Sequence, residues 1–201
     1  MILVTFAVPF ESAAFRRRAA SRGVRIVHTG VGRDAARAAL ELAVCTELPE
    51  RVISSGFAGA LVPGLVVGKI VCDADGTRFA SADAVLATAR EKRDFRERTG
   101  ADAVDMETDA IRDVCAAAGV PLKILRAISD GADDELGLPP DLLAGLAAKS
   151  PGAMARTAWM LLGDGARRRA FLRLVRDCRT AQLALADALE REIGQGWCRQ
   201  Y

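Results

Sequence analysis

Histidine is nearly absent from this sequence, and its cysteines are few and scattered. A single histidine, His28, makes a His-based catalytic triad or a two-histidine metal site a poor expectation. The five cysteines form no C-x-x-C pair and are odd in number, which argues against a disulfide framework and against a zinc site. We therefore expect reduced thiols that pack as small apolar side chains, and no bound metal.

Long apolar runs and an excess of one charge are also missing. Runs such as Ile2–Val8 and Leu61–Val67 end well before the roughly 18 residues that a membrane span needs. Pro9 and Glu11 interrupt the first run, which has no basic flank, so no signal peptide is predicted. The 28 basic and 26 acidic residues give a net charge of +2, and thus no general reason to expect nucleic acid or membrane binding. We expect a cytoplasmic protein.

The composition is that of a folded chain, because 51% of the 201 residues are hydrophobic. The length favours a single domain over residues 1–201. Short β-rich runs alternate with Ala-rich helical stretches, which predicts an α/β fold with a central, largely parallel or mixed sheet flanked by helices. The predicted strands are Met1–Val8, Val24–Thr29, Arg51–Ser55, Val66–Cys72, Phe79–Ala87, Asp102–Val104 and Leu122–Ile128, and the helices among them are Arg33–Cys45 and Met106–Ala118.

From Pro139 onward only helices are predicted. Three Leu/Ala/Arg-rich stretches, Asp141–Lys149, Ala153–Leu162 and Ala166–Glu192, are separated by breaks too short for a linker. We expect residues 139–192 to pack on the sheet as an all-helical part of the same domain. The Arg167–Arg169 cluster is interspersed with acidic residues, which favours a solvated helix face over a basic patch.

The stretch from Thr29 to Ala35, T-G-V-G-R-D-A, follows a predicted strand and opens a helix. Glycines there let backbone amides approach an anion, so Thr29, Gly30, Gly32 and Arg33 are candidate anion or phosphate ligands. The stretch also reads as G-x-G-x-x-A, a variant of the dinucleotide fingerprint, which leaves a NAD(P)-dependent oxidoreductase open. It follows the second strand, whereas the fingerprint closes the first, and a tight turn explains the glycines equally well.

A second stretch, Ser54–Ala60, places small residues at a predicted strand end. A flat ligand can lie against main chain there, although an ordinary crossing from strand to loop explains the pattern as well.

A third stretch carries two carboxylates around the predicted helix Met106–Ala118. Glu107 falls in the first helical turn, where the helix dipole keeps a carboxylate ionised. Asp130 falls past the end of a buried strand, where partial desolvation raises the pKa of a carboxyl group. Such a separation of pKa values is typical of divided acid and base roles. Purely structural roles would be an N-cap for Asp105, a capping carboxylate for Glu107 and a turn former for Asp130.

These stretches, in this order, resemble the purine nucleoside phosphorylase and nucleosidase superfamily, including 5′-methylthioadenosine/S-adenosylhomocysteine nucleosidases. Val104–Glu107 and Arg126–Asp130 are similar to its V-[DE]-M-E and R-[AV]-[IL]-S-D motifs. Ser55–Leu61 is similar to its T-G-x-A-G-x-L loop, and Ser81–Leu86 to its S-G-D-x-F-[IV] strand. The resemblance runs to about Asp134. The tail resembles the hopanoid-associated branch, thought to act on adenosylhopane.

The resemblance implies a role for each matching residue. Glu107 would bind the ribose 2′ and 3′ hydroxyls, with Met106 packing under the sugar. Asp130 would protonate or hydrogen-bond purine N7 so that the base leaves neutral, and Ser129 would help to place it. Glu11 matches the glutamate that activates the attacking water in nucleosidases. The residues implied to hold the base are Val85 and Leu86, with main chain near Ala58 and Gly59.

Two departures from the family pattern concern the pocket. Phe57 stands where relatives often have Ser, which removes a hydroxyl near the sugar or the nucleophile. The segment Asp73–Ala80 is shorter than its counterpart, so part of the pocket wall is missing or supplied otherwise. An open 5′ side suits a bulky apolar substituent, and equally a weakened enzyme.

The predicted function is cleavage of the N-ribosidic bond of a purine nucleoside, with adenine favoured as the base, by water. Glu11 and the lack of a G-D-P-x-R phosphate loop favour water, although Arg33 keeps a phosphate-dependent phosphorylase open. The sequence also leaves open an oxidoreductase and a non-catalytic nucleoside-binding protein. No cofactor is expected for the hydrolysis, and the resemblance implies a homodimer or larger homo-oligomer.

Overall fold

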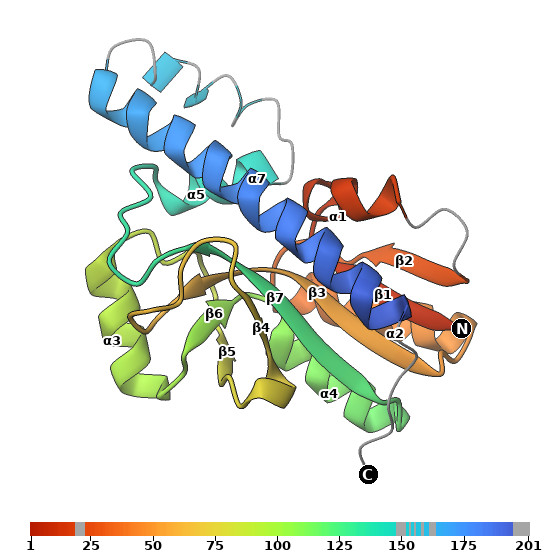
Figure 1. The fold of residues 1–201 in the computed structure, drawn as a ribbon. Helices are drawn as coiled ribbons and strands as arrows, with labels where there is room; N and C mark the ends of the chain where they lie inside the picture. The colour runs from red at the N-terminus through yellow and green to blue at the C-terminus, as the bar shows by residue number, and fades with distance from the viewer. Residues whose placement is uncertain are drawn as a thin grey trace.

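The computed structural model describes residues 1–18, 23–147, 152, 154, 156, 157, 159, 160 and 164–194. Within these residues the chain forms a seven-stranded mixed sheet with helices on both faces (Figure 1). The elements are the strands β1 (Ile2–Phe6), β2 (Val24–His28), β3 (Arg51–Ala60), β4 (Ile70–Cys72), β5 (Phe79–Ser81), β6 (Ala103–Asp105) and β7 (Leu122–Asp130), and the helices α1 (Pro9–Arg16), α2 (Arg33–Thr46), α3 (Ala89–Thr99), α4 (Thr108–Ala118), α5 (Pro140–Ala147) and α7 (Gly165–Gly194).

The strands β1, β3 and β7 run parallel, so their carboxyl ends point the same way. β2 extends this parallel group beside β1, whereas β4 joins β7 antiparallel. The end of β3 pairs antiparallel with β6, and β5 lies parallel to β6. The predicted α/β fold with a mixed sheet flanked by helices is therefore confirmed.

Alternate residues of the central strands face opposite layers of helices, as the two-residue repeat of a strand requires. Leu3 and Val52 pack with the apolar sides of α2 and α4. Val4 and Ile53 pack with α1 and α7 on the other face. Each strand is thus buried on both sides, which is why its sequence is a nearly continuous apolar run.

Three strand boundaries differ from the prediction by more than two residues. β3 continues through the small residues of Ser54–Ala60, because β7 pairs with it as far as Gly59. The predicted loop there is wrong. The strand predicted over Val66–Cys72 begins only at Ile70, after Gly68 has turned the chain with a φ of 83°. The strand predicted over Phe79–Ala87 ends at Ser81.

Two short helices, α1 and α3, are not anticipated by the sequence analysis. α1 begins at Pro9, directly after the first apolar run, and no helix was predicted between the first two strands. α3 has a capping box, in which the Thr88 hydroxyl accepts from the amide of Glu91, and it ends at Gly100 with a φ of 67°. Thr88 and Glu91 are the signal from which α3 was predictable.

The C-terminal part is helical where the structure describes it. α5 and α7 confirm the predicted helices Asp141–Lys149 and Ala166–Glu192 to within two residues at each end. The predicted helix Ala153–Leu162 lies partly outside the described residues, and those of its residues that are described are helical. Among the described helices, none combines the length and the apolar character needed to cross a bilayer.

Candidate active site

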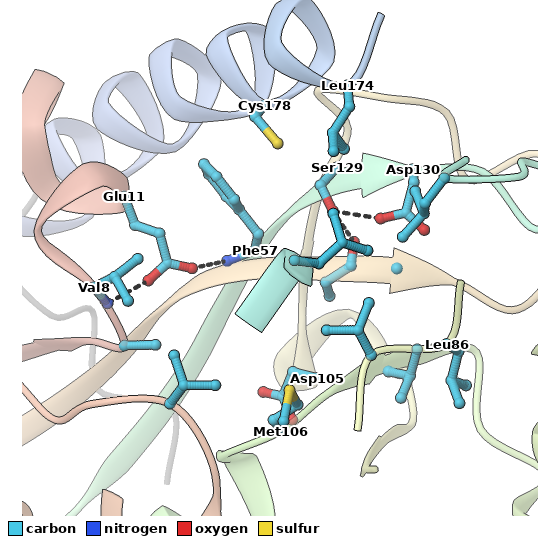
Figure 2. A pocket seen from close by; sticks show the side chains of 18 of the residues that line it. Val8, Glu11, Phe57, Leu86, Asp105, Met106, Ser129, Asp130, Leu174 and Cys178 are labelled. Carbon is cyan, nitrogen blue, oxygen red and sulfur yellow. Dashed lines mark hydrogen bonds between the residues drawn. The ribbon is translucent and has the colours of Figure 1, made fainter. Parts of the chain in front are cut away.

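A cavity of about 470 Å³ lies at the carboxyl end of β1 and β7, under α7 (Figure 2). Its volume is within the range of small-molecule binding sites. The wall is mostly apolar, and Leu174 and Cys178 point into the cavity from α7 in Figure 2. The charged residues in this wall are Glu11, Lys92, Asp105, Glu107 and Asp130.

Glu11 is buried on the first turn of α1, and two backbone amides fix its carboxylate. Oε1 accepts from the amide of Phe57 at 2.9 Å, and Oε2 accepts from the amide of Val8 at 3.2 Å (Figure 2). A Cβ on Gly56 would stand 3.0 Å from Oε1, so a small residue is needed in β3 at this point. Burial raises the pKa of Glu11, although the two amides act in the opposite direction.

Glu107 precedes the first residue of α4 and is 9% exposed. Its Oε1 accepts from the amide of Gly32 at 2.7 Å. Burial raises the pKa of Glu107 to about 7, and the negative charges of Asp105 and Glu11 act in the same direction. The prediction that the helix dipole keeps this carboxylate ionised is therefore wrong in its direction, because desolvation outweighs the dipole.

Asp130 is the last residue of β7 and does not lie past the strand end as predicted, because β7 pairs with β3 as far as Gly59. It forms an ion pair that was not predicted from the sequence. Lys92 Nζ lies 2.5 Å from Asp130 Oδ2, and the lysine side chain is only 1% exposed. Nζ also donates to the carbonyl of Gly131 at 2.6 Å. The Ser129 hydroxyl donates to Asp130 Oδ1 at 2.6 Å (Figure 2). The Asp130 carboxylate, for which partial desolvation was expected, therefore lies against a buried cation.

Lys92 was not predicted as a site residue, because the strongly charged sequence of α3 is typical of a solvent-exposed helix. It lies one residue after Glu91, the capping residue of the same helix. Only the tertiary structure, in which α3 packs through Phe95 against Leu61 and Val104, reveals that this lysine points inward. A Cβ on Gly59 would stand 3.0 Å from Asp130 Oδ2, so the glycine leaves the space that the carboxylate occupies.

Asp105 and Arg126 form a buried ion pair beneath the cavity. Arg126 donates to Asp105 Oδ2 from Nη2 at 2.6 Å and from Nε at 2.9 Å. Asp105 Oδ1 accepts from the amides of Glu107 and Thr108, so it caps α4, although Glu107 holds the N-cap position. Burial alone raises the pKa of Asp105, but the Arg126 charge and the hydrogen bonds outweigh it and hold the pKa below its ordinary value.

The residues predicted to hold the sugar and base all line the same cavity. They come from β3, from the loop after β5, and from the ends of β6 and β7. The structure thereby brings together Phe57, Ala58, Gly59, Val85, Leu86, Met106 and Ser129.

The candidate anion ligands of the Thr29–Arg33 stretch have protein partners instead. The Thr29 hydroxyl donates to the carbonyls of Phe6 and Gly30. The Gly32 amide donates to Glu107, and Arg33 binds the Ser81 carbonyl. Arg33 also lies 3.5 Å from an oxygen of Asp83. These donors therefore serve to tie the loop to the neighbouring strands and to a cavity carboxylate.

The last part of the wall comes from the C-terminal helices. The shortened segment Asp73–Ala80 does not reach the cavity. Apolar side chains from distant positions in the sequence stand over the cavity in its place, and they were not predicted as site residues. They are Leu143 and Leu146 of α5, and Phe171, Leu174, Val175 and Cys178 of α7.

Within the part of the chain that the structure describes, no three His, Cys, Asp or Glu side chains are grouped so that they could hold a metal ion. Fold and site together define an α/β protein with several acidic groups facing one apolar cavity.

Comparison with known proteins shows which family the chain is similar to. Residues 74–156 match the family model of the Phosphorylase superfamily. The 5′-methylthioadenosine/S-adenosylhomocysteine nucleosidase of Actinobacillus succinogenes is 29% identical over 190 aligned residues, which cover 69% of this chain and 81% of the relative. The nucleosidase of Haemophilus influenzae is 27% identical over 195 aligned residues, with coverage of 72% and 84%. The chain is thus similar to the phosphorylase superfamily and to its nucleosidases, and the resemblance found in its sequence is confirmed.

Solved structures share the fold at low sequence identity. Futalosine hydrolase of Helicobacter pylori superposes with a TM-score of 0.70 at 14% identity, covering 96% of this chain and 97% of that chain. The nucleosidase of the same organism, solved with 5′-methylthioadenosine in its active site, gives a TM-score of 0.69 at 14% identity, covering 96% and 98%.

Proposed function

We propose that this protein hydrolyses the N-ribosidic bond of an adenine nucleoside and releases the free base. The observation that carries the proposal is that Glu11, Glu107 and Asp130 face one cavity. The relatives named above as nucleosidases and as a hydrolase support water as the nucleophile.

Glu107 acts at the sugar in this proposal. Breaking the N-ribosidic bond develops positive charge at C1′, and a carboxylate nearby stabilises that charge. Because its pKa is about 7, Glu107 changes charge near neutral pH and can accept hydrogen bonds from the ribose hydroxyls when ionised. Met106 lies beside it in the cavity wall, where it would pack under the sugar.

Asp130 acts at the base. The departing purine gains negative charge, and a proton passing from the carboxyl group to N7 lets the base leave neutral. The Lys92 ammonium stabilises the carboxylate that remains after this transfer, since it lies 2.5 Å from Oδ2. Ser129 holds the other carboxylate oxygen. Lys92 is thus a positioning residue, and Asp130 the acid.

Glu11 is the general base for the attacking water. Burial raises its pKa and makes it a stronger base than an exposed glutamate. A second, small cavity of about 10 Å³ adjoins Glu11, Glu107 and Arg126. That volume matches about one water molecule and is too small for a phosphate ion. The buried hydroxyls of Thr5 and Ser55 line it without protein partners among the described residues.

The substrate carries a bulky apolar 5′ substituent of the adenosylhopane kind in this proposal. The support is the apolar wall that α5 and α7 place over the cavity, including Phe171 and Leu174. In a series of 5′-alkylthio adenosines, kcat/KM should rise about fourfold with each buried methylene, at about 0.8 kcal/mol each. Leu174→Asp should flatten this rise and change adenosine turnover far less. An equal slope in both proteins would contradict the apolar 5′ site.

The direct test is release of adenine from adenosine, methylthioadenosine and 5′-alkylthio adenosines, with and without phosphate. Release without phosphate is expected, and it should fall by at least 100-fold in Glu107→Gln and Asp130→Asn. Release that requires phosphate would keep the bond cleavage but make the enzyme a phosphorylase. Nucleoside binding with no release under either condition would overturn the proposal in favour of a binding protein. A cytoplasmic homo-oligomer remains a prediction.

A further inference from the structure

A stripe of exposed side chains runs along one side of α7. Leu172 and Val175 are 60% and 46% exposed, and Leu183 is 40% exposed. Residues 172, 175, 176, 179 and 183 follow a spacing of three to four residues, so they share one side of the helix. Arg176 and Arg179 occupy the positions between the apolar ones. We call these five residues the α7 stripe.

The first half of α7 carries a strong local excess of positive charge. Between Gly165 and Thr180 the chain has six arginines and one aspartate, a net charge of +5 in a protein whose total is +2. The near balance of the whole chain therefore conceals a basic element, and the expectation that interspersed acids offset the Arg167–Arg169 cluster does not hold for this half of the helix. In Figure 1 this half of the helix extends beyond the sheet, whereas the second half lies over β7 and β1.

The α7 stripe borders the cavity. Val175 belongs to both, because it lines the cavity and is 46% exposed. Phe10 of α1 also lines the cavity and is 42% exposed. An apolar side chain that is half in a cavity and half in solvent stands at its opening. The rim of the opening is therefore apolar, with arginines next to it.

We propose that the α7 stripe docks on the surface of an anionic lipid bilayer. Leucine and valine side chains insert at the level of the acyl boundary, and arginines beside them bind lipid phosphates while their stems pack on apolar surface. Nucleic acid would satisfy the arginines, but it offers nothing to Leu172, Val175 and Phe10. The helix lies on the membrane and does not cross it.

Docking gives the cavity a direct route to the lipid phase. A nucleoside with a long apolar 5′ group is held by the bilayer, and an apolar rim in contact with the bilayer lets that group enter without passing through water. This consequence rests on the proposed function. The docking itself does not, since it follows from exposure, charge and spacing along α7.

The test is co-sedimentation of the full chain with vesicles of phosphatidylcholine alone and with 30% phosphatidylglycerol. Binding is expected only to the anionic vesicles, and it should be largely lost in 1 M salt, where screening reaches about 3 Å. No binding to anionic vesicles in 0.1 M salt would overturn the proposal. Equal binding to neutral vesicles would overturn the role of the arginines. Competition by an oligonucleotide that removes all vesicle binding would assign the arginines to nucleic acid.

Variants separate the stripe from general charge. Reversing Arg176 and Arg179 of the stripe to Glu, together with Arg168 one turn before Leu172, should weaken partitioning at least fivefold for each residue. The matched control reverses three exposed arginines of α3, Arg90, Arg93 and Arg96, and should change partitioning far less. Unchanged partitioning in the first variant, or an equal loss in the control, would overturn the proposal.

A second pair tests the apolar contribution of the stripe. Leu172→Glu should abolish insertion, whereas Leu42→Glu, on the 70% exposed Leu42 of α2, should not. Adenine release from methylthioadenosine reports the proposed function separately, because it needs no vesicles. Loss of vesicle binding with that release intact is the expected pattern for Leu172→Glu. A chain that binds vesicles but releases no adenine would contradict only the proposed function.

Discussion

Several carboxyl groups and one ammonium share the cavity, and the neighbours of each decide its charge. Glu107 shows the balance most clearly, because one amide from Gly32 and a helix start favour its anion while burial and two nearby carboxyl groups oppose it. The outcome is a pKa of about 7, compared with an ordinary value of 4.5. Such a group is poised to change charge in the working range of an enzyme.

The raised pKa of Glu107 makes folding stability depend on pH. Between pH 4.5 and 7 the folded state holds a proton that the unfolded state has lost, so stability decreases as the pH rises through this range. The decrease is about 3 kcal/mol. Glu107→Gln removes this pH dependence. In urea unfolding, the free energy of unfolding of the variant should therefore rise relative to that of the native protein by about 3 kcal/mol between pH 4.5 and 8. The exposed Glu97→Gln is the control, and an equal gain there would contradict the assignment.

Lys92 sets the behaviour of Asp130. Without the ammonium, the carboxylate left after proton transfer is less stable, so Lys92→Met should slow base release about 100-fold. Lys92→Arg should restore part of the rate.

Rates of base release in Lys92→Met and Lys92→Arg check this prediction about Lys92. The control is Lys123→Met, which removes an ion pair with Glu192 at 2.6 Å that lies outside the cavity lining. A Lys92→Arg enzyme that is no faster than Lys92→Met would show that the positive charge beside Asp130 is not required and that Lys92 has a structural role only.

At the scale of elements, the conformation of a loop depends on the side chain that its backbone binds. The loop between β2 and α2 turns at Gly32, whose φ is 93°, and its amide reaches Glu107. A Gly-rich stretch before a helix is typical of phosphate sites, but here a carboxylate of the protein takes the amide. α7 likewise has two roles: its second half packs in the core, and its first half covers the cavity.

The effect of the positive φ of Gly32 on stability can be distinguished from the effect of its hydrogen bond to Glu107 on activity. Gly32→Ala should lower the free energy of unfolding by about 1–2 kcal/mol, because an L residue is strained at this φ. It should also lower base release, since the amide that orients Glu107 shifts. Gly64→Ala has the same kind of strain, at a φ of 86° in open space, without a cavity contact. It should cost similar stability and leave release unchanged, and equal losses of activity would contradict the role of Gly32.

At the scale of the whole molecule, the sheet and the C-terminal helix share one core. Leu185 and Leu189 of α7 are fully buried against Phe15 of α1 and strands of the sheet. This packing supports the proposal that residues 1–201 form a single domain, which remains a prediction.

A single domain predicts one cooperative unfolding transition. Leu185→Ala should lower the free energy of unfolding by about 2–5 kcal/mol, because it leaves a cavity in the shared core. Urea unfolding followed by far-UV and near-UV circular dichroism should give coincident curves that shift together. A separate early transition confined to helical signal would show that α7 forms its own unit.

The order of motifs along the chain was enough to predict the α/β fold, the family resemblance and many of the residues that line the cavity. Strand periodicity and glycine placement are local properties, so they can be recognised in the sequence without the tertiary structure. What only the tertiary structure decided are contacts between distant segments, such as Lys92 with Asp130, the α7 wall over the cavity, and the burial that makes Glu107 a weak acid. Desolvation depends on every atom around a group, and no spacing rule along the chain encodes it.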